Sequence, residues 1–230
     1  MASQKNDCGQ PIGESMLGWS APPAPSAKPL EGRYCRLEPL DSGRHGAQLH
    51  DAFSESSDGS IWTYLGYGPF ASQGDYLDWI DSFCGGEDPI FYAVIDKDNG
   101  SAIVGQASYL RIQPPFGSIE VGHICYAPRL QRRRAATETM FLLMRHAFEL
   151  GYRRYEWKCD SLNDPSRRAA ERLGFQYEGT FRQAMIYKGR NRDTAWYSIT
   201  NKEWPGIEKR FLRWLDPGNF EEDGSQRTSL

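Results

Sequence analysis

The sequence lacks a long apolar segment and a leader in which basic residues precede apolar ones. Its longest apolar run covers residues 140–144, whereas a helix that crosses a bilayer needs about 20 apolar residues. The first residues carry no basic stretch followed by an apolar one, which marks a secretory signal. We therefore expect a cytoplasmic protein that is neither secreted nor embedded in a membrane.

Cysteine is scarce, and its spacing suggests no pairing. The chain has five cysteines and no Cys-x-x-Cys motif. An odd number of scattered cysteines is typical of reduced thiols and not of a disulfide framework. Structural zinc sites usually contain closely spaced cysteine pairs, so we expect no metal site. The five residues are Cys8, Cys35, Cys84, Cys125 and Cys159.

An excess of positive charge is also missing. The 27 Lys and Arg residues face 30 Asp and Glu residues, which gives a formal net charge of -3. Such a chain has no global positive field to gather nucleic acid or an anionic membrane. We expect no nucleic-acid partner and no membrane partner, and any polyanion site must be a local basic cluster.

The composition that remains is that of one folded domain with loose ends. Hydrophobic residues make up 39% of the 230 positions and aromatic residues 13%, which is enough for one sizeable core. Residues 1–30 are rich in proline and polar residues, and residues 216–230 are acidic and rich in turn residues. We predict flexible tails at 1–30 and 216–230 and a folded domain at 31–215.

Helical and strand-like patterns alternate within the predicted domain. Helical spacing of apolar residues appears from position 41 to 53 and from 72 to 84, and again after Pro128 until Gly151. Three predicted strands between these helices are joined by turn-forming residues, which indicates an antiparallel meander. The remaining elements are strands at 152–159, 175–187 and 195–200 and a helix at 165–173. The three strands of the meander cover residues 90–95, 102–112 and 118–126.

This order predicts an α+β fold with one parallel strand pair. The strand ending at Tyr126, the long helix after it and the strand at 152–159 form a strand–helix–strand unit. Such a unit makes its two strands parallel neighbours with the helix as crossover. A ligand can enter where the two strands diverge.

A basic turn precedes the long helix. It reads Gln131-Arg132-Arg133-Arg134-Ala135-Ala136-Thr137. The unpaired N–H groups at a helix start stabilise an anion, and neighbouring arginines strengthen the positive field. A phosphate group fits this place, and a merely solvated basic turn is the alternative.

The turn and its surroundings resemble the GNAT superfamily of acyl-CoA-dependent N-acyltransferases. The match is the phosphate loop, 131–136, followed by Ala136-Thr137-Glu138, which is similar to the branch of ribosomal-protein N-acetyltransferases and spermidine acetyltransferases. Arg134 stands where the family usually has glycine. The resemblance implies a mixed, mainly antiparallel twisted sheet with a splayed parallel pair and flanking helices. It also implies acetyl-CoA as co-substrate, with its phosphates held by residues 131–137.

The same resemblance assigns further site residues. Glu120, eleven residues before Gln131, corresponds to the glutamate that removes a proton from the attacking amine. Asn163 and the helix after it would line the thiol end of the co-substrate. Ala170 stands where many members have a tyrosine that acts as general acid, so Ser166 is the candidate for that role. The backbone of Ile124, Cys125 and Tyr126 would bind the pantetheine amides and polarise the thioester carbonyl.

Each assignment has a structural alternative. The alternative for Glu120 is a strand carboxylate paired with a nearby arginine, and the alternative for Ser166 is a polar residue in the first turn of its helix. We expect His123 to be a packed or hydrogen-bonded core residue and Cys125 to be packing and not a nucleophile. The aromatic residues at 62–70 either shape the acceptor pocket or cap the core.

The leading hypothesis is an N-acetyltransferase that works by direct attack in a ternary complex. Its acceptor would be a primary amine of a protein N-terminus, a polyamine or a small metabolite, and a homodimer is an open option. The competing hypothesis is a non-catalytic acyl-CoA-binding or interaction module. RNA binding through Arg132–Arg134 and Arg153–Arg154 is a weaker third, because the aromatic residues needed for base stacking are not interleaved with these arginines on one strand face.

Overall fold

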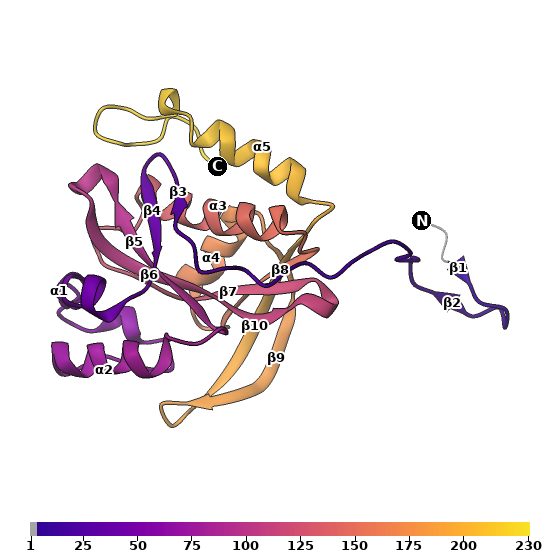
Figure 1. Ribbon diagram of the computed structural model, residues 1–230, viewed down its shortest axis with the longest axis horizontal. Helices are drawn as coiled ribbons and strands as arrows, with labels where there is room; N and C mark the ends of the chain where they lie inside the picture. The colour runs from indigo at the N-terminus through magenta and orange to yellow at the C-terminus, as the bar shows by residue number, and fades with distance from the viewer. Residues whose placement is uncertain (1–3) are drawn as a thin grey trace.

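A single twisted sheet organises the chain (Figure 1). The computed structural model describes residues 4–230. Its main sheet has eight strands in the order β3-β4-β5-β6-β7-β8-β10-β9. The strands are β3 (Leu30–Glu31), β4 (Cys35–Pro39), β5 (Ile90–Asp96), β6 (Ala102–Gln113), β7 (Ser118–Tyr126), β8 (Arg154–Asp160), β9 (Gln176–Tyr187) and β10 (Arg190–Thr200). The predicted α+β class is confirmed.

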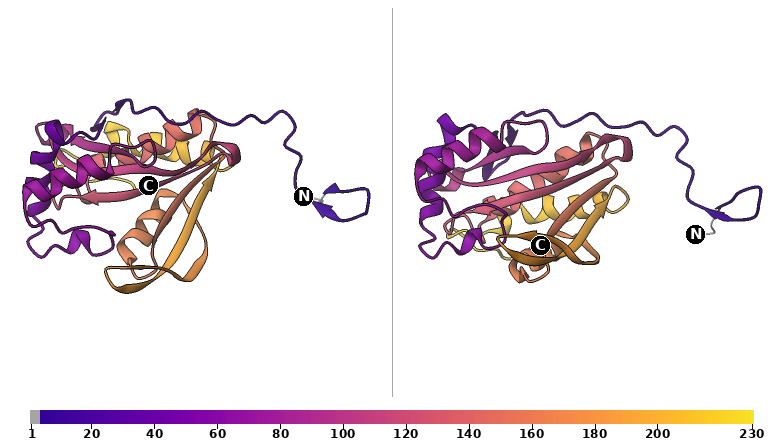
Figure 2. Two further views of the ribbon diagram at one scale, coloured as in Figure 1. Left: turned by 60° about the horizontal axis from the view of Figure 1, so that its bottom comes forward. Right: turned by 90° about the horizontal axis from the view of Figure 1, so that it is seen from below.

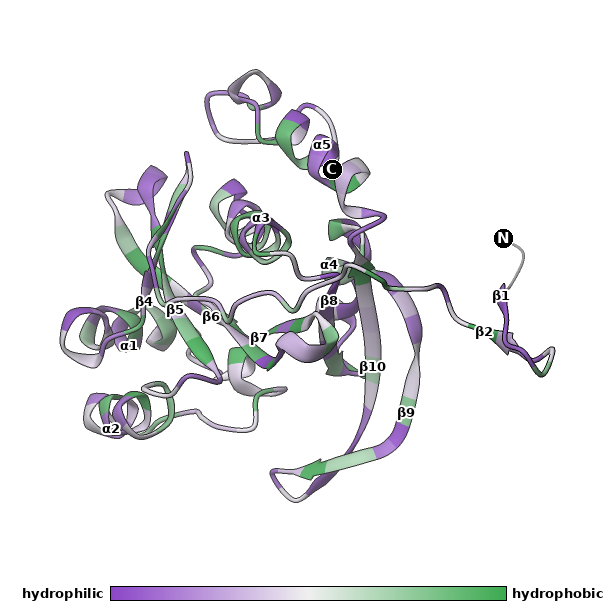
Figure 3. Cartoon of the chain, turned by 45° about the vertical axis from the view of Figure 1, so that its right-hand side comes forward, coloured by the Kyte–Doolittle hydropathy of each residue, from purple (hydrophilic) through white to green (hydrophobic). Residues whose placement is uncertain are grey.

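The helices lie on both faces of this sheet. Helices α1 and α2 cover one face and α3 the other (Figure 3). On β6, the side chain of Gln106 meets Tyr76 of α2, whereas the side chain of Tyr109 donates to the carbonyl of Leu143 in α3. The five α-helices of residues 4–230 are α1 (Ala47–Ser54), α2 (Gln73–Phe83), α3 (Arg134–Glu149), α4 (Asp164–Leu173) and α5 (Trp204–Trp214).

One strand pair of the sheet is parallel and splayed. Residues 118–121 of β7 pair with 154–157 of β8, and α3 is the crossover between them. Pairing stops after Val121 and Trp157 although both strands continue, so the backbone edges that face each other beyond this point lack ladder partners. The other neighbours in the main sheet are antiparallel. The predicted splayed parallel pair is therefore confirmed.

A bulge on β7 lies directly at the point of divergence. The register with β6 shifts by one residue between Gln106↔Cys125 and Ser108↔Gly122, which leaves an extra residue on β7. His123 lies in this bulge with φ of 51°. A bulge bends its strand and re-aims the side chains around it. The alternation of residues along 118–126 gives no sign of this bulge.

Helix α5 is an element to which the sequence analysis assigned no structure. It buries Trp204, Ile207, Phe211 and Trp214, whose spacing follows a helical period. Phe141 of α3 stacks on Phe211 with ring centroids 5.3 Å apart. The helix therefore covers the outer side of α3.

Both terminal segments touch the domain. Upstream of β3, Pro22 is buried and lies beside Gly151, whereas the first described residues form a small hairpin, β1 (Gln4–Lys5) with β2 (Pro11–Ile12), away from the domain (Figure 1). After α5, Phe220 is buried between Tyr34 and Trp214. The limits 31–215 and the flexibility of the tails stay predictions.

Candidate active site

The basic turn and the start of α3 form an open helix N-terminus. Arg133 is the N-cap residue and provides no side-chain hydrogen bond to the first turn. Gln131 tethers the turn to β7, because its Nε2 donates to the carbonyl of Tyr126 at 3.0 Å. Gln131, Arg132 and Arg133 are exposed. The turn therefore offers uncapped N–H groups and two exposed guanidinium groups to an anion.

Arg134 does not obstruct this helix start. Its guanidinium turns to Asp98 in the loop between β5 and β6, with Nε to Oδ2 at 2.6 Å and Nη2 to Oδ1 at 3.0 Å. It also lies over the ring of Tyr34, 4.2 Å from the centroid. These contacts tie the guanidinium group to Asp98 and Tyr34. An arginine in place of the family's glycine is therefore compatible with anion binding at the backbone.

The residues after Arg134 are packed. Ala135 and Ala136 are buried, which lets the first turn of α3 approach the sheet closely. Thr137 is also buried and accepts a hydrogen bond from Arg172 of α4 at 3.2 Å. Of the predicted phosphate-binding residues, these three contribute packing and backbone, whereas residues 131–133 contribute exposed side chains.

Glu138 has a structural role that the sequence pattern did not reveal. Its buried carboxylate accepts three backbone hydrogen bonds, from the N–H groups of Arg33, Tyr34 and Cys35 at 2.9, 2.6 and 2.7 Å. Arg33 and Tyr34 lie in the turn between β3 and β4, and Cys35 is the first residue of β4. Glu138 therefore fastens this turn to α3, close to the candidate phosphate site.

The strand segment after the bulge contains the predicted pantetheine-binding residues. Cys125 and Tyr126 pair with β6, so the edge of β7 that faces β8 is the one without partners. Cys125 is buried, and burial raises the pKa of its thiol. A thiol in that state is a poor nucleophile, in agreement with the expectation of a packing role. Ile124 precedes these residues on the same free edge.

Glu120 lies in a buried ion cluster. Only 3% of the residue is exposed. Arg111 Nη1 donates to both carboxylate oxygens at 2.8 Å, and Lys158 Nζ lies 2.8 Å from Oε2. Lys158 also contacts Glu156 at 2.8 Å and lies over the ring of Trp196. An arginine therefore lies beside Glu120, as in the alternative interpretation of this residue as a paired strand carboxylate. In addition, Lys158 contacts the carboxylate, and the carboxylate is buried.

The contact of Lys158 with Glu120 follows from the register of the parallel strand pair. Glu120 pairs with Glu156 across the parallel ladder. A residue two positions further along β8 points to the same face. That reasoning needs the register, which the sequence patterns did not fix.

Ser166 and Asn163 lie together at the start of α4. The amide oxygen of Asn163 accepts from the backbone N–H of Ser166 at 3.2 Å and so caps the helix. The hydroxyl of Ser166 accepts from Trp157 Nε1 at 3.0 Å. Trp157 is the last residue of β8 that pairs with β7, so the hydroxyl lies beside the point where these two strands diverge. Ala170, at the position where many family members have the tyrosine, is fully buried.

Aromatic residues between α1 and α2 pack into a cluster next to the bulge. Trp62 contacts Tyr67 and Phe70, and Tyr67 stacks on the ring of His123 with centroids 5.6 Å apart. His123 is therefore hydrogen-bonded and packed, as expected. The cluster connects the 59–70 loop to the diverging strands.

The β9–β10 hairpin reaches across to the same loop (Figure 2). Lys188 at its turn donates to the carbonyl of Trp62 at 2.7 Å, and Tyr187 donates to the buried carboxylate of Asp160 at 2.8 Å. From the loop, Tyr64 donates to the carbonyl of Leu162 at 3.1 Å. The hairpin, the loop and the end of β8 therefore meet beside the candidate site.

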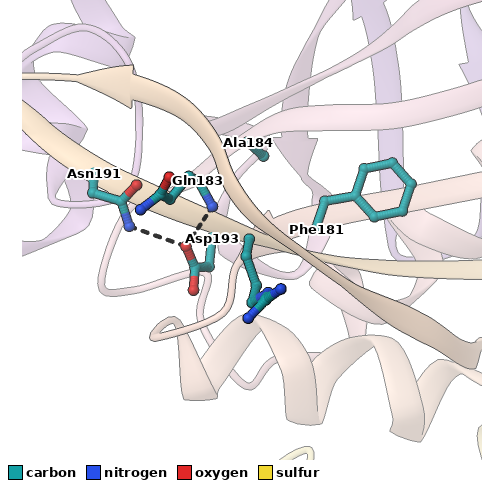
Figure 4. Close-up of a pocket in the computed structure, with 6 residues that line it drawn as sticks. Phe181, Gln183, Ala184, Asn191 and Asp193 are labelled. Carbon is teal, nitrogen blue, oxygen red and sulfur yellow. Dashed lines mark hydrogen bonds between the residues drawn. The ribbon is translucent and has the colours of Figure 1, made fainter.

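A separate hollow lies along the hairpin itself (Figure 4). Asp193 organises it by accepting from the backbone N–H of Gln183 at 2.8 Å and from Asn191 Nδ2 at 3.0 Å. None of the predicted site residues lines this hollow. Among residues 4–230 no group of three or more His, Cys, Asp and Glu side chains is arranged to hold a metal ion. No helix of that part of the chain has the length and apolar character that crossing a bilayer requires.

Comparison with known proteins gives a consistent result. The family model described as acetyltransferase (GNAT) domain matches residues 37–176. A GCN5-related N-acetyltransferase from Brucella melitensis is 45% identical, with 93% of this chain and 97% of that chain covered and a TM-score of 0.90. A GNAT-family protein from Chromobacterium violaceum is 42% identical over 85% of this chain and 98% of its own, with a TM-score of 0.79. None of the curated proteins compared matches the chain.

Proposed function

Because this chain belongs to the GNAT family of acetyltransferases, we propose that it transfers an acetyl group from acetyl-CoA to a primary amine. The transfer is direct, within a ternary complex. The observation that carries this proposal is the uncapped start of α3, which follows two exposed arginines and the strand that diverges from β8. This arrangement brings an anion site and a free strand edge together.

The chain's residues suit acetyl-CoA in two places. The backbone of residues 131–137, with Arg132 and Arg133, would hold the diphosphate at the helix start. The free edge of β7 at residues 124–126 would bind the pantetheine amides, since unpaired backbone groups need partners. Asn163 and the start of α4 would line the thiol end.

Glu120 is the proposed base. An amine is mostly protonated at neutral pH, so attack on a thioester needs a group that takes its proton. Arg111 and Lys158 hold the carboxylate in one orientation. Oε1 accepts only from Arg111, so one of its lone pairs is left to take the proton of the arriving acceptor, directly or through water.

Ser166 is the proposed proton donor to the leaving thiolate. Its oxygen accepts from Trp157, so the hydroxyl hydrogen is free to point elsewhere. The thiol of Cys159 is its neighbour. The position of the hydroxyl beside the diverging strands favours the role of proton donor over that of a polar residue in the first turn of α4.

The acceptor would be a protein N-terminus, a polyamine or a small amine-bearing metabolite. A Salmonella typhimurium acetyltransferase that modifies the N-terminal serine of ribosomal protein L7/L12 has a similar fold, with a TM-score of 0.60 at 20% identity. This likeness of fold supports the first class as a candidate and the ribosomal-protein branch as a proposal. A cytoplasmic location and a homodimer belong to the same proposal.

A non-catalytic acyl-CoA-binding module is the second candidate. The enclosure of Glu120 by Arg111 and Lys158 favours it, because two cations already bind the carboxylate that transfer needs as its proton acceptor. Thiol release from acetyl-CoA, measured over a panel of amines and N-terminal peptides, separates the two. Release that depends on an amine supports transfer, whereas binding by calorimetry without release supports the module. If the chain binds neither CoA nor acetyl-CoA, both candidates are wrong.

The role of Glu120 has its own test. In Glu120→Gln, turnover should fall at least a hundredfold while the Kd of acetyl-CoA stays within threefold. Gln keeps the shape of the side chain and removes the proton-accepting charge. Unchanged turnover would remove Glu120 from the mechanism.

A further inference from the structure

His123 is the partly exposed titratable group nearest the divergence of β7 and β8 that the proposed mechanism leaves unused. It occupies the bulge with φ of 51°. Its ring packs against Tyr67, Phe83 and Phe91, with centroid distances of 5.6, 5.6 and 5.0 Å. The ring is therefore held in place on three sides.

A chain of polar side chains inside the aromatic cluster ends at this ring. Tyr76 donates to Oε1 of Gln106 at 2.6 Å, and Nε2 of Gln106 donates to the hydroxyl of Tyr67 at 3.3 Å. The shorter distance is typical of an O–H donor. In the orientation of the amide that the structure has, the carbonyl oxygen faces Tyr76 and the nitrogen faces Tyr67. Gln106 is fully buried and cannot exchange these partners for water.

The chain determines which nitrogen of His123 carries a proton. The hydroxyl of Tyr67 already accepts from Gln106, so its own hydrogen is available to Nδ1 of His123, 3.2 Å away. Nδ1 is then an acceptor without a proton. The neutral imidazole must carry its hydrogen on Nε2.

The surroundings keep the imidazole neutral. Burial, and then the charge of Arg111, lowers the pKa of His123 from 6.5 to about 4. The group facing it from the 59–70 loop is Tyr67, a neutral hydroxyl whose own pKa is raised by burial. At physiological pH the residue is therefore a fixed N–H donor and not a cation.

Nε2 points to open space. It has no hydrogen-bond partner among residues 4–230, and it is not among the buried polar atoms left without one, so it keeps contact with solvent. Arg111, the residue whose charge acts on His123, also binds Glu120. The free N–H therefore lies in the neighbourhood of the proposed base.

We propose that His123 donates a hydrogen bond from Nε2 to an oxygen atom of the acceptor, and so selects acceptors that carry such an oxygen beside the amine. This inference rests on the proposed function. A peptide N-terminus has its first carbonyl in that position. A protonated polyamine offers only N–H donors there and leaves the imidazole N–H without a partner, which is costly in a partly buried site. The acceptor class is therefore an α-amino amide, such as a peptide N-terminus, in preference to a polyamine.

Two substitutions separate this role from a structural one. The amide nitrogen of glutamine can replace Nε2 as a donor, whereas that of asparagine reaches only the position of Nδ1. Asparagine, however, tolerates the positive φ of the bulge better than glutamine. If the role of His123 is structural, His123→Asn should reduce activity less than His123→Gln. If His123 donates a hydrogen bond from Nε2, His123→Gln should reduce activity less than His123→Asn.

The kinetic experiment compares alaninamide with isopropylamine, which lacks the carboxamide. Wild type should have the larger kcat/KM with alaninamide. His123→Asn should lower that value at least tenfold and change the value for isopropylamine less than threefold. His123→Gln should stay within threefold for both amines. Equal losses with both amines, or a milder effect of Asn than of Gln, would overturn the proposal.

A spectroscopic measurement tests the fixed proton separately from turnover. Nitrogen-15 NMR of the histidine rings at pH 7 should show His123 neutral with its hydrogen on Nε2. In Tyr67→Phe this signature should weaken toward a mixture of tautomers. A hydrogen on Nδ1, or a cationic ring, in wild type overturns the inference even if no amine is acetylated. Absence of thiol release with every amine, together with the expected NMR signature, contradicts the proposed function and removes the acceptor role of His123 with it.

Discussion

Arg111 of β6 and Glu120 of β7 form a two-oxygen contact: one guanidinium nitrogen lies 2.8 Å from each carboxylate oxygen. Arg111 is half-exposed, whereas the carboxylate is buried. Lys158, whose side chain is also buried, completes the pair from β8. The residue proposed as base is therefore held between one accessible and one inaccessible cation.

Removing Lys158 should destabilise the fold. Lys158→Met removes the cation that the buried carboxylate of Glu120 shares with the half-buried carboxylate of Glu156. Breaking a buried ion pair costs about 3 kcal/mol when the remaining charge is left alone. Because Arg111 still pairs with Glu120 and Arg154 with Glu156, we expect a smaller loss of about 1–2 kcal/mol. Urea unfolding should show this loss, and the double variant Lys158→Met with Glu156→Gln should recover part of it. An unchanged free energy of unfolding would contradict the cluster.

Reversing the charge of Arg133 should weaken acetyl-CoA binding. Arg133→Glu places a carboxylate at the uncapped start of α3, where the diphosphate would bind. We expect the Kd from calorimetry to rise at least tenfold, which is about 1.4 kcal/mol. Arg190→Glu makes the same change of charge on the exposed hairpin and serves as control. Equal effects of the two variants would place the diphosphate elsewhere.

Glu138→Gln should destabilise the protein without altering co-substrate binding. In the wild type, three backbone N–H groups donate to the two carboxylate oxygens of Glu138. In the variant, the NH₂ group of glutamine replaces one of these oxygens and cannot accept a hydrogen bond. Leaving a buried donor unsatisfied costs about 2 kcal/mol. Chemical unfolding measures the loss. Glu149→Gln at the exposed end of α3 should be nearly neutral, because its contact with Arg145 is a surface ion pair.

The ion pair of Arg154 and Glu178 should contribute to the free energy of unfolding, and this contribution should be lost at low pH. The hydrogen bonds from Arg154 lower the pKa of Glu178 from 4.5 to about 2. The unfolded chain lacks this contact, so its carboxyl binds protons at higher pH than the folded one. The contribution of the pair is complete above pH 4.5 and is lost as the pH falls toward 2.

Unfolding of wild type and Glu178→Gln as a function of pH tests this sign. The stability difference between them should be largest above pH 4.5 and shrink as the pH falls toward 2. A difference that stays constant over this range would show that the contact does not shift the titration of Glu178. Because Glu178 is largely open to solvent, added salt should reduce the difference as well.

The sequence predicted those parts of the fold that depend on local patterns. The turn residues between β5, β6 and β7 specify hairpins, and the apolar period after Pro128 specifies α3. The parallel pair follows from the crossover rule. Helix α5 was missed, although Trp204, Ile207, Phe211 and Trp214 have the helical spacing that predicts it.

The candidate site was predictable as a set of positions and not as a set of contacts. Glu120, Ser166 and the basic turn were found from spacing. The contact of Glu120 with Lys158 depends on strand register, and the conformation of His123 depends on a one-residue bulge. The orientation of the Arg134 side chain depends on its ion pair with Asp98, a residue distant in sequence. Such long-range contacts leave no periodic trace in the chain.

The tip of the β9–β10 hairpin should act as a removable contact with the 59–70 loop. Lys188 is tied to the loop only through the carbonyl of Trp62, and Tyr187 holds Asp160 with one hydrogen bond. Lys188→Met with Tyr187→Phe removes both ties. Amide hydrogen exchange at residues 183–192 should then speed up about tenfold, since one to two kcal/mol of contact is lost. Acetyl-CoA binding should stay unchanged, because neither residue lies near α3, and the KM for the amine should change more than kcat. If the exchange rates stay at wild-type values, the hairpin is rigid on its own and the contact does not restrain it.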